Sequence, residues 1–208
     1  TPGGGLEYDW TIPDRPTTHA RVKISDASDV TVFDTSAADF KIQGVFTISA
    51  PNGSEVLVVG APVDITWATV GSVNNVKLQY STNGGTTFDV SIADTIANSG
   101  TYSWTVPDAI SAQVRVRVAD TNDDTAFDTS NGNFKIKGAL TLTSPVGGET
   151  WIVGSSHDIT WLRTGSVSLV KLEYSTTGGT TYLGNIATNV DASLLIHSWT
   201  VPDAIGSQ

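Results

Sequence analysis

The chain of 208 residues contains no cysteine and no methionine. Disulfides, thiolate metal sites and cysteine nucleophiles are therefore excluded, and the lack of oxidisable sulfur suits an exposed, oxidising location. No apolar run approaches the roughly 18 residues that a membrane-spanning helix needs. Because the net charge is -10, the chain repels phosphate backbones and anionic lipid surfaces. We expect no nucleic-acid partner and no membrane insertion.

Glutamate is also scarce, and it occurs only at Glu7, Glu55, Glu149 and Glu173. Aspartate supplies most of the acidic groups, while threonine, serine and glycine are abundant. Good helix formers are therefore rare and strand or turn formers are common. The composition predicts an all-β protein.

One sequence motif recurs along the chain and sets its organisation. Tryptophan, threonine, a β-branched residue, proline and aspartate follow one another from Trp10, Trp104 and Trp199, at intervals of 94 and 95 residues. Other landmarks share the 94-residue spacing: Trp67 with Trp161, Tyr80 with Tyr174, Asp34 with Asp128, and Phe40 with Phe134. Such a period predicts a tandem array of one structural unit.

A Phe-Lys-Ile-x-Gly motif marks the end of each repeat, at Gly44 and again at Gly138. The predicted domains are 1–44, the C-terminal half of a β-sandwich repeat; 45–138, a complete repeat; and 139–208, the N-terminal part of a further repeat.

The last part has no equivalent of the two strands between residues 114 and 137, so its core and strand edges are expected to be open. Either the polypeptide continues at both ends, or residues 20–44 of a neighbouring copy supply the strands. Residues 1–19 and 190–208 align with the same stretch of the repeat, a redundancy that favours a continuing polypeptide.

Residues 45–138 show the period-two alternation of half-buried strands, as in Val63, Ile65 and Trp67. Strands are predicted near 46–49, 56–59, 62–68, 75–81, 88–92, 101–106, 113–119 and 133–137. Seven or eight short strands in fewer than 100 residues are typical of tandem immunoglobulin-like (Ig-like) or fibronectin III-like β-sandwich modules. Trp67 and Trp104 are expected to form the aromatic centre of the core.

A longer string in the last part carries a family resemblance. The residues from Leu142 to Gly154 contain Ser-Pro-x-Gly-Gly-Glu-x-Trp, and the strand ending in Trp161 follows. This pattern resembles the sandwich repeat of many bacterial cell-surface and secreted proteins. It is similar to the domain named for Ser/Thr-rich glycosylphosphatidylinositol-anchored yeast cell-wall proteins. The resemblance implies a spacer or stalk at the cell surface.

No catalytic residues are expected. His19, His157 and His197 do not recur with the repeat, so structural or surface roles are favoured over catalysis. Aspartates that follow proline in every repeat, such as Asp108, are better interpreted as turn or capping groups than as paired catalytic carboxylates. The chain is predicted not to be an enzyme.

The strongest candidates for metal ligands are Asp120, Asn122 and Asp124, with Asp128 further along the chain. Oxygen ligands at alternate loop positions can converge on calcium, but Thr125 stands where an EF-hand loop requires glycine. A solvated acidic turn joining two strands is the favoured alternative. No cofactor is expected, and calcium at this turn is the one alternative to that expectation.

These observations predict a structural protein: an extracellular or cell-surface stalk or filament whose partners are adjacent copies of the same repeat or protein, head to tail. The alternative is an adhesin or carbohydrate-binding surface module. For that alternative, Trp151 is the candidate platform for a sugar ring, since the complete repeat has Leu57 there. The competing interpretation packs the Trp151 ring under the first strand of its repeat.

Overall fold

The computed structural model describes residues 8–204, and its regular structure is all-β. A single turn of 3₁₀ helix, η1 (Ala192–Leu194), interrupts the strands. Within residues 8–204 no helix has the length and apolar character needed to span a bilayer.

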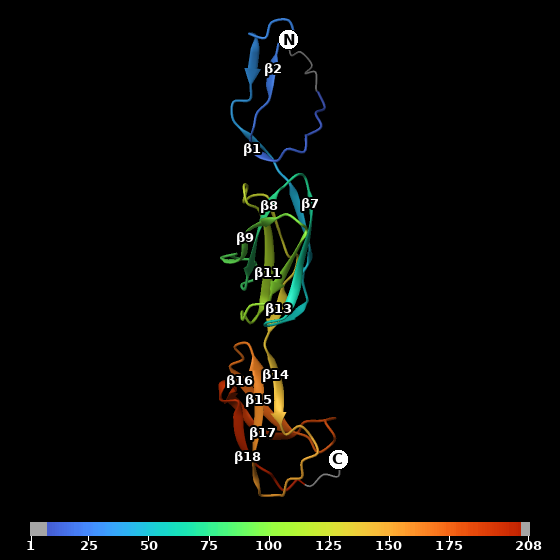
Figure 1. Ribbon diagram of the computed structural model, residues 1–208, viewed down its shortest axis with the longest axis vertical. Coiled ribbons are helices and arrows are strands. Elements are labelled where there is room, and N and C mark those ends of the chain that lie inside the picture. The colour runs from blue at the N-terminus through green and yellow to red at the C-terminus, as the bar shows by residue number, and fades with distance from the viewer. Residues whose placement is uncertain (1–7, 205–208) are drawn as a thin grey trace, which may run out of the picture. The chain divides into compact units, whose positions relative to one another are not determined.

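The central strands form two sheets, as expected for an Ig-like or fibronectin III-like sandwich (Figure 1). One sheet has the order β10-β7-β5 and the other the order β6-β13-β11-β8-β9, with β12 paired to β11. The β5-β7, β8-β9, β8-β11 and β11-β12 pairs are antiparallel, whereas β13 pairs with β6 in parallel. The strands are β5 (Val45–Ala50), β6 (Val56–Val58), β7 (Pro62–Val70), β8 (Asn75–Ser81), β9 (Val90–Ala97), β10 (Thr101–Thr105), β11 (Ser111–Asp120), β12 (Phe127–Thr129) and β13 (Phe134–Lys137).

Alternating side chains of these strands form the core. Trp67 and Trp104 are both buried, which confirms their expected place, and the Trp104 ring lies 5.6 Å from that of Tyr80. Trp67 is held at its polar end, because its Nε1 donates a hydrogen bond of 2.7 Å to Oδ1 of Asn98. Burial of two large rings replaces the disulfide that a chain without cysteine cannot form.

Two strands differ from the expectation. The strand expected near 88–92 starts at Val90, because Oδ1 of Asn83 accepts the amide of Thr87 and keeps the preceding residues in a loop. Strand β12 was not predicted. It has three residues, too few for a readable alternation, and exists by pairing with β11.

The residues from 139 onward form a three-stranded sheet, β14-β15-β18, and a separate two-stranded sheet, β16-β17. Their buried cluster consists of Ile159, Trp161, Val170 and Ala192. The strands are β14 (Ala139–Ser144), β15 (Ser156–Thr164), β16 (Leu169–Tyr174), β17 (Gly184–Asp191) and β18 (Ile196–Thr200).

The residues before Gly44 form two small sheets, β1-β4 and β2-β3. Their apolar side chains are largely exposed, and no strand of the larger sheets pairs with them among the described residues. The strands are β1 (Thr17–Ala20), β2 (Lys23–Ser25), β3 (Phe33–Thr35) and β4 (Phe40–Ile42).

The chain divides into two compact units. Unit 1 holds the described residues up to Glu55 together with Asp64–Trp104 and Gln113–Phe134. Unit 2 holds Val56–Val63, Thr105–Ala112 and the described residues from Lys135 onward. Residues on both sides of Gly44 thus belong to unit 1, and residues on both sides of Gly138 belong to unit 2. The limits 1–44, 45–138 and 139–208 stay a prediction.

Candidate functional site

The recurring Pro-Asp pair forms the same tight turn at Asp14, Asp108 and Asp203. In each turn the amide of the residue after the aspartate donates to the carbonyl of the proline before it. The three hydrogen bonds are Arg15 to Pro13, 2.8 Å; Ala109 to Pro107, 2.8 Å; and Ala204 to Pro202, 2.9 Å. The local sequence therefore builds one conformation three times.

In unit 1 the carboxylate of Asp14 binds a Gly-Ser turn 58 residues further along the chain. The amide of Ser72 donates to Oδ1 at 2.5 Å, and the hydroxyl of Ser72 donates to Oδ2 at 2.7 Å. The turn is closed by the amide of Val73, which donates to the carbonyl of Gly71 at 2.9 Å. Both carboxylate oxygens of Asp14 are used.

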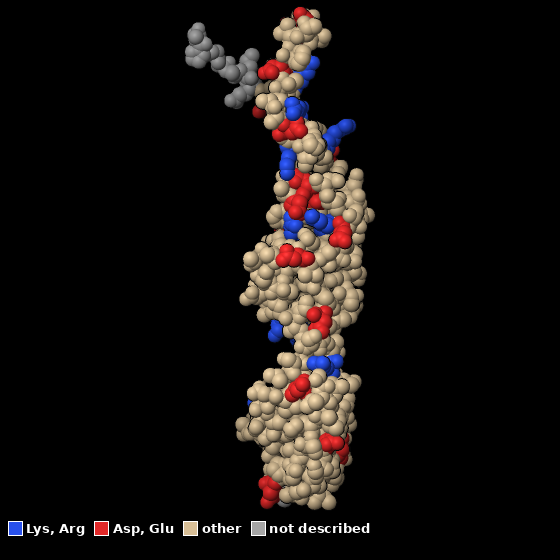
Figure 2. Space-filling view, turned by 90° about the vertical axis from the view of Figure 1, so that its left-hand side faces the viewer, with Lys and Arg blue, Asp and Glu red and all other residues tan. Residues whose placement is uncertain are grey.

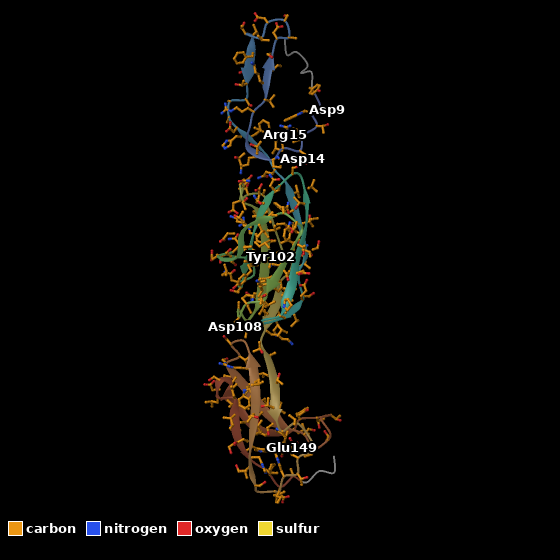
Figure 3. All side chains as sticks on the ribbon, in the orientation of Figure 1. Asp9, Asp14, Arg15, Tyr102, Asp108 and Glu149 are labelled. Carbon is orange, nitrogen blue, oxygen red and sulfur yellow. The ribbon has the colours of Figure 1, made fainter. Side chains whose placement is uncertain are left out.

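In unit 2 the carboxylate of Asp108 makes the same pair of contacts, again 58 residues along the chain. The amide of Ser166 donates to Oδ1 at 2.9 Å, and the hydroxyl of Ser166 donates to Oδ2. We call the aspartate and its Gly-Ser turn the Asp–Ser junction. Figure 3 labels both aspartates, and each lies beside the loop that holds its serine.

Glycine is needed around the junction in unit 2. Gly165 has φ +79°, and a Cβ there would come within 2.9 Å of Val59 Cγ2 and 3.1 Å of Asp108 Oδ1. A Cβ on Gly138 would meet the carbonyl oxygen of Thr164 at 2.5 Å. The Phe-Lys-Ile-x-Gly motif therefore ends in glycine because backbone from the next strand pair passes against it.

The hydrogen bonds of the junction hold both aspartates in the ionised form. The Ser72 hydroxyl, and then its amide, lower the pKa of Asp14, and the Ser166 hydroxyl and amide do the same to the pKa of Asp108. A carboxylate that accepts two donors is favoured over the protonated acid, which accepts less well. The junction is therefore complete at neutral pH.

A second polar contact in unit 1 involves the acidic turn between β11 and β12. Lys41 Nζ donates to Oδ1 of Asp123 at 2.9 Å, and Gln43 Nε2 donates to Oδ2 at 2.7 Å. The amide and the hydroxyl of Thr125 also donate to Oδ1. The pKa of Asp123 is strongly lowered by the hydrogen bonds from Gln43, Thr125 and Lys41. Acidic and basic side chains adjoin one another on the face shown in Figure 2.

The proposed calcium ligands have separate partners. Asp120 accepts the amide of Asn122, and Asp128 accepts the amide of Ile48. The carboxylate of Asp124 lies between Lys77 and Arg117. In the part of the chain that the structure describes, no three acidic or histidine side chains are grouped so that they could hold a metal ion. Calcium binding at these residues stays the less favoured of the two alternatives.

Trp151 packs against other rings. It stacks on His157, with ring centroids 4.3 Å apart, and meets Trp199 at 6.0 Å. An open cavity of about 340 Å³ adjoins it, lined in part by Pro145, Trp151, Tyr174 and Trp199.

Sequence reasoning placed the Pro-Asp aspartates in turns but did not find their partners. The signal was present: Gly71-Ser72 and Gly165-Ser166 recur at the same 94-residue interval as Asp14 and Asp108. A carboxylate and a Gly-Ser pair that recur together indicate a contact, but only the fold shows which serine each carboxylate reaches.

Comparison with known proteins supports the fold class. Residues 50–136, fewer than half of the chain, match the family model of the Kre9/KNH-like N-terminal Ig-like domain. No curated protein matches the chain.

Similar solved structures include the fibronectin(III)-like modules of Clostridium thermocellum CbhA, with 17% identity over 76% of this chain and 79% of that chain and a TM-score of 0.30. The titin domains z1z2 in complex with telethonin are 16% identical over 79% of this chain and 84% of that chain, with a TM-score of 0.28. DIP-gamma IG1+IG2 is 7% identical over 78% of this chain and 86% of that chain, with a TM-score of 0.27. The fold class rests on the strand arrangement and on the Ig-like family model, not on these low scores.

Proposed function

We propose that this chain is part of an extracellular structural protein in which tandem Ig-like repeats form a stalk or filament. The Asp–Ser junction carries the proposal, because the same two hydrogen bonds are made twice by residues 94 positions apart. Contacts that recur with the sequence period are what a linear array needs, since each repeat then meets the next in the same way.

A structural or surface role also agrees with the family model, since Kre9/KNH-like domains are cell-wall-associated. Ig-like and fibronectin III-like families are typically non-enzymatic modules. The net charge of -10 keeps such a chain apart from anionic surfaces and favours specific contacts over general adhesion. We place the protein outside the cell or at its surface.

The proposal predicts that the junctions restrict motion between repeats. We expect the double variant Asp14→Ala and Asp108→Ala to sample a wider range of dimensions than the unchanged chain in small-angle X-ray scattering. Asp9→Ala is the matched control, because it removes an aspartate directly before the same motif and leaves the junction intact. An unchanged scattering profile for the double variant would count against the proposal.

A carbohydrate-binding surface module is the second candidate, and the cavity beside Trp151 and Trp199 favours it. Indole rings at an open cavity of about 340 Å³ resemble a sugar-stacking platform. A glycan array probed with the chain and with Trp151→Ala tests this directly. Binding that Trp151→Ala abolishes would establish a lectin-like activity for this region.

A further inference from the structure

We infer that the chain binds a second copy of itself head to tail, and that residues 17–44 of one copy add their strands to residues 139–204 of the other. The inference deepens the proposed function and rests on it, because it names the partner and the surfaces of one contact in the array. It is carried by three complementary features: apolar faces, a cavity, and charges.

The acceptor surface is apolar and open. Leu140 and Leu142 on β14 are each 51% exposed, although the corresponding Phe46 and Ile48 on β5 are buried. Strand β16 pairs only with β17 within residues 8–204, whereas β8, at the corresponding position, lies between β9 and β11. Within residues 8–204, one edge of β16 is therefore left unpaired and could accept a strand like β11.

The donor segment offers that strand. Val22 and Ile24 are largely exposed, although the corresponding Val116 and Val118 on β11 are fully buried. The segment thus carries the apolar side chains of a core strand, but no other described residues bury them. Covering such residues is favourable because it removes apolar surface from water.

The known pairing fixes the register of the donated strands. In the complete repeat, β11 lies opposite β8, with Val116 facing Tyr80 and Val118 facing Leu78, while β13 lies beside β6, with Ile136 facing Leu57. The same register between two copies gives three pairs: Val22 with Tyr174, Ile24 with Leu172, and Ile42 with Trp151.

The cavity beside Trp199 matches the next part of the donor. In the complete repeat the hydroxyl of Ser130 donates to the carbonyl of Pro51 at 2.8 Å, and Phe134 fills the adjoining core. The corresponding cavity of about 340 Å³ is lined by Pro145. Ser36 and Phe40 of the second copy supply the missing hydroxyl and ring.

The charges agree with the same placement. Asp29 of the donor accepts the amide and hydroxyl of Thr31, the turn that Asp123 makes with Thr125. Lys135 and Lys137 line an open cavity of about 630 Å³ in unit 2, at the positions that Lys41 and Gln43 hold in unit 1. The donated turn brings Asp29 to these lysines, as Asp123 meets Lys41.

One contact must be exchanged. Residues 8–14 of the donor and 197–203 of the acceptor carry the same Trp motif, so Trp199 takes the position of Trp10, and Asp203 replaces Asp14 at Ser72 of the donor. Two equivalent substitutions therefore have opposite effects. Asp14→Ala frees Ser72 and should strengthen association, whereas Asp203→Ala should weaken it.

Sedimentation velocity of the 208-residue chain over a concentration series tests the inference. The unchanged chain should form dimers and longer species. Ile24→Asp blocks the donor and Leu142→Asp blocks the acceptor, so each variant alone should raise the dissociation constant about tenfold or more. An equimolar mixture of the two should form dimers that grow no further, because one good donor and one good acceptor remain.

Val90→Asp, on β9 of the complete repeat, is the matched control and should associate like the unchanged chain. Circular dichroism of each variant checks that the fold is retained. A chain that stays monomeric throughout, or association that neither Ile24→Asp nor Leu142→Asp weakens, overturns the inference. Either result leaves the proposed function standing, because scattering tests the Asp–Ser junctions inside single chains.

Discussion

Of two pairs of corresponding tryptophans, one pair is equally buried and the other differs in burial between the complete repeat and the residues from 139 onward. Trp67 on β7 and Trp161 on β15 are both 4% exposed. Trp104 on β10 is just as buried, but Trp199 on β18 is only half-buried. The strand sequences are alike, so the difference comes from what packs against them. The second sheet of the complete repeat contains β6, β11, β12 and β13 besides β8 and β9, whereas the second sheet within residues 139–204 is β16-β17 alone.

The comparison shows that packing of the β14-β15-β18 sheet against β16-β17 is enough to bury the residues around Trp161. The indole of Trp161 is fixed by its Nε1, which donates to the carbonyl of Ala192 at 3.0 Å, and Val170 completes the cluster. The remaining face depends on strands that come later in the repeat. Burial of a residue such as Trp199 is therefore set by its neighbours in the sandwich more than by its own motif.

Separate expression of the two regions gives the largest expected difference. Residues 45–138 alone should unfold cooperatively as a monomeric sandwich, because every strand of its two sheets lies within those limits. Residues 139–208 alone should aggregate or unfold without a sharp transition. Thermal denaturation followed by circular dichroism measures both, and a sharp, monomeric transition for residues 139–208 would remove the basis of the comparison.

The two tryptophans sharpen the comparison within the intact chain. Trp104→Ala should destabilise its repeat by about 3 to 5 kcal/mol, the usual cost of removing a buried aromatic side chain. Trp199→Ala should cost clearly less, because its ring already contacts water. Urea denaturation of both variants decides this, and equal losses would mean that the half-open face contributes as much as the closed one.

Acidification should open the Asp–Ser junction. The folded pKa of Asp108 lies below its ordinary value of 3.8, so the ionised carboxylate favours the closed junction above that pH. The contribution is lost as the pH falls through the lowered pKa. The amide resonance of Ser166 in a nuclear magnetic resonance titration should report this step, and Asp108→Asn should remove it. A step above pH 3.8 would contradict the assignment.

Calcium should have the smallest effect. Asp124 is already paired with Lys77 and Arg117, and Asp128 with the amide of Ile48, so ligands must give up existing partners to bind a cation. We expect equal melting curves with millimolar calcium and with chelator. A higher melting temperature in calcium that Asp124→Ala abolishes would establish the site that the sequence pattern allows.

Much of the fold could be predicted from the sequence, because the alternation around Ile65 and Trp67 has one buried face and one exposed face. The short strand β12 could not, since three residues carry no periodic signal. The contact of Asp123 in the acidic turn with Lys41, a partner 82 residues away, could not be predicted either. Contacts between such distant residues depend on the register of whole strands, which local patterns do not contain.

Amide hydrogen exchange at Ser72 and Ser166 tests the central claim most directly. If the Asp–Ser junction holds successive repeats together, both amides exchange slowly in the unchanged chain. In the dilute, monomeric chain, Asp14→Ala should then speed exchange at Ser72 alone, and Asp108→Ala at Ser166 alone. Fast exchange at both serines in the unchanged chain, or exchange that neither variant alters, would contradict the account.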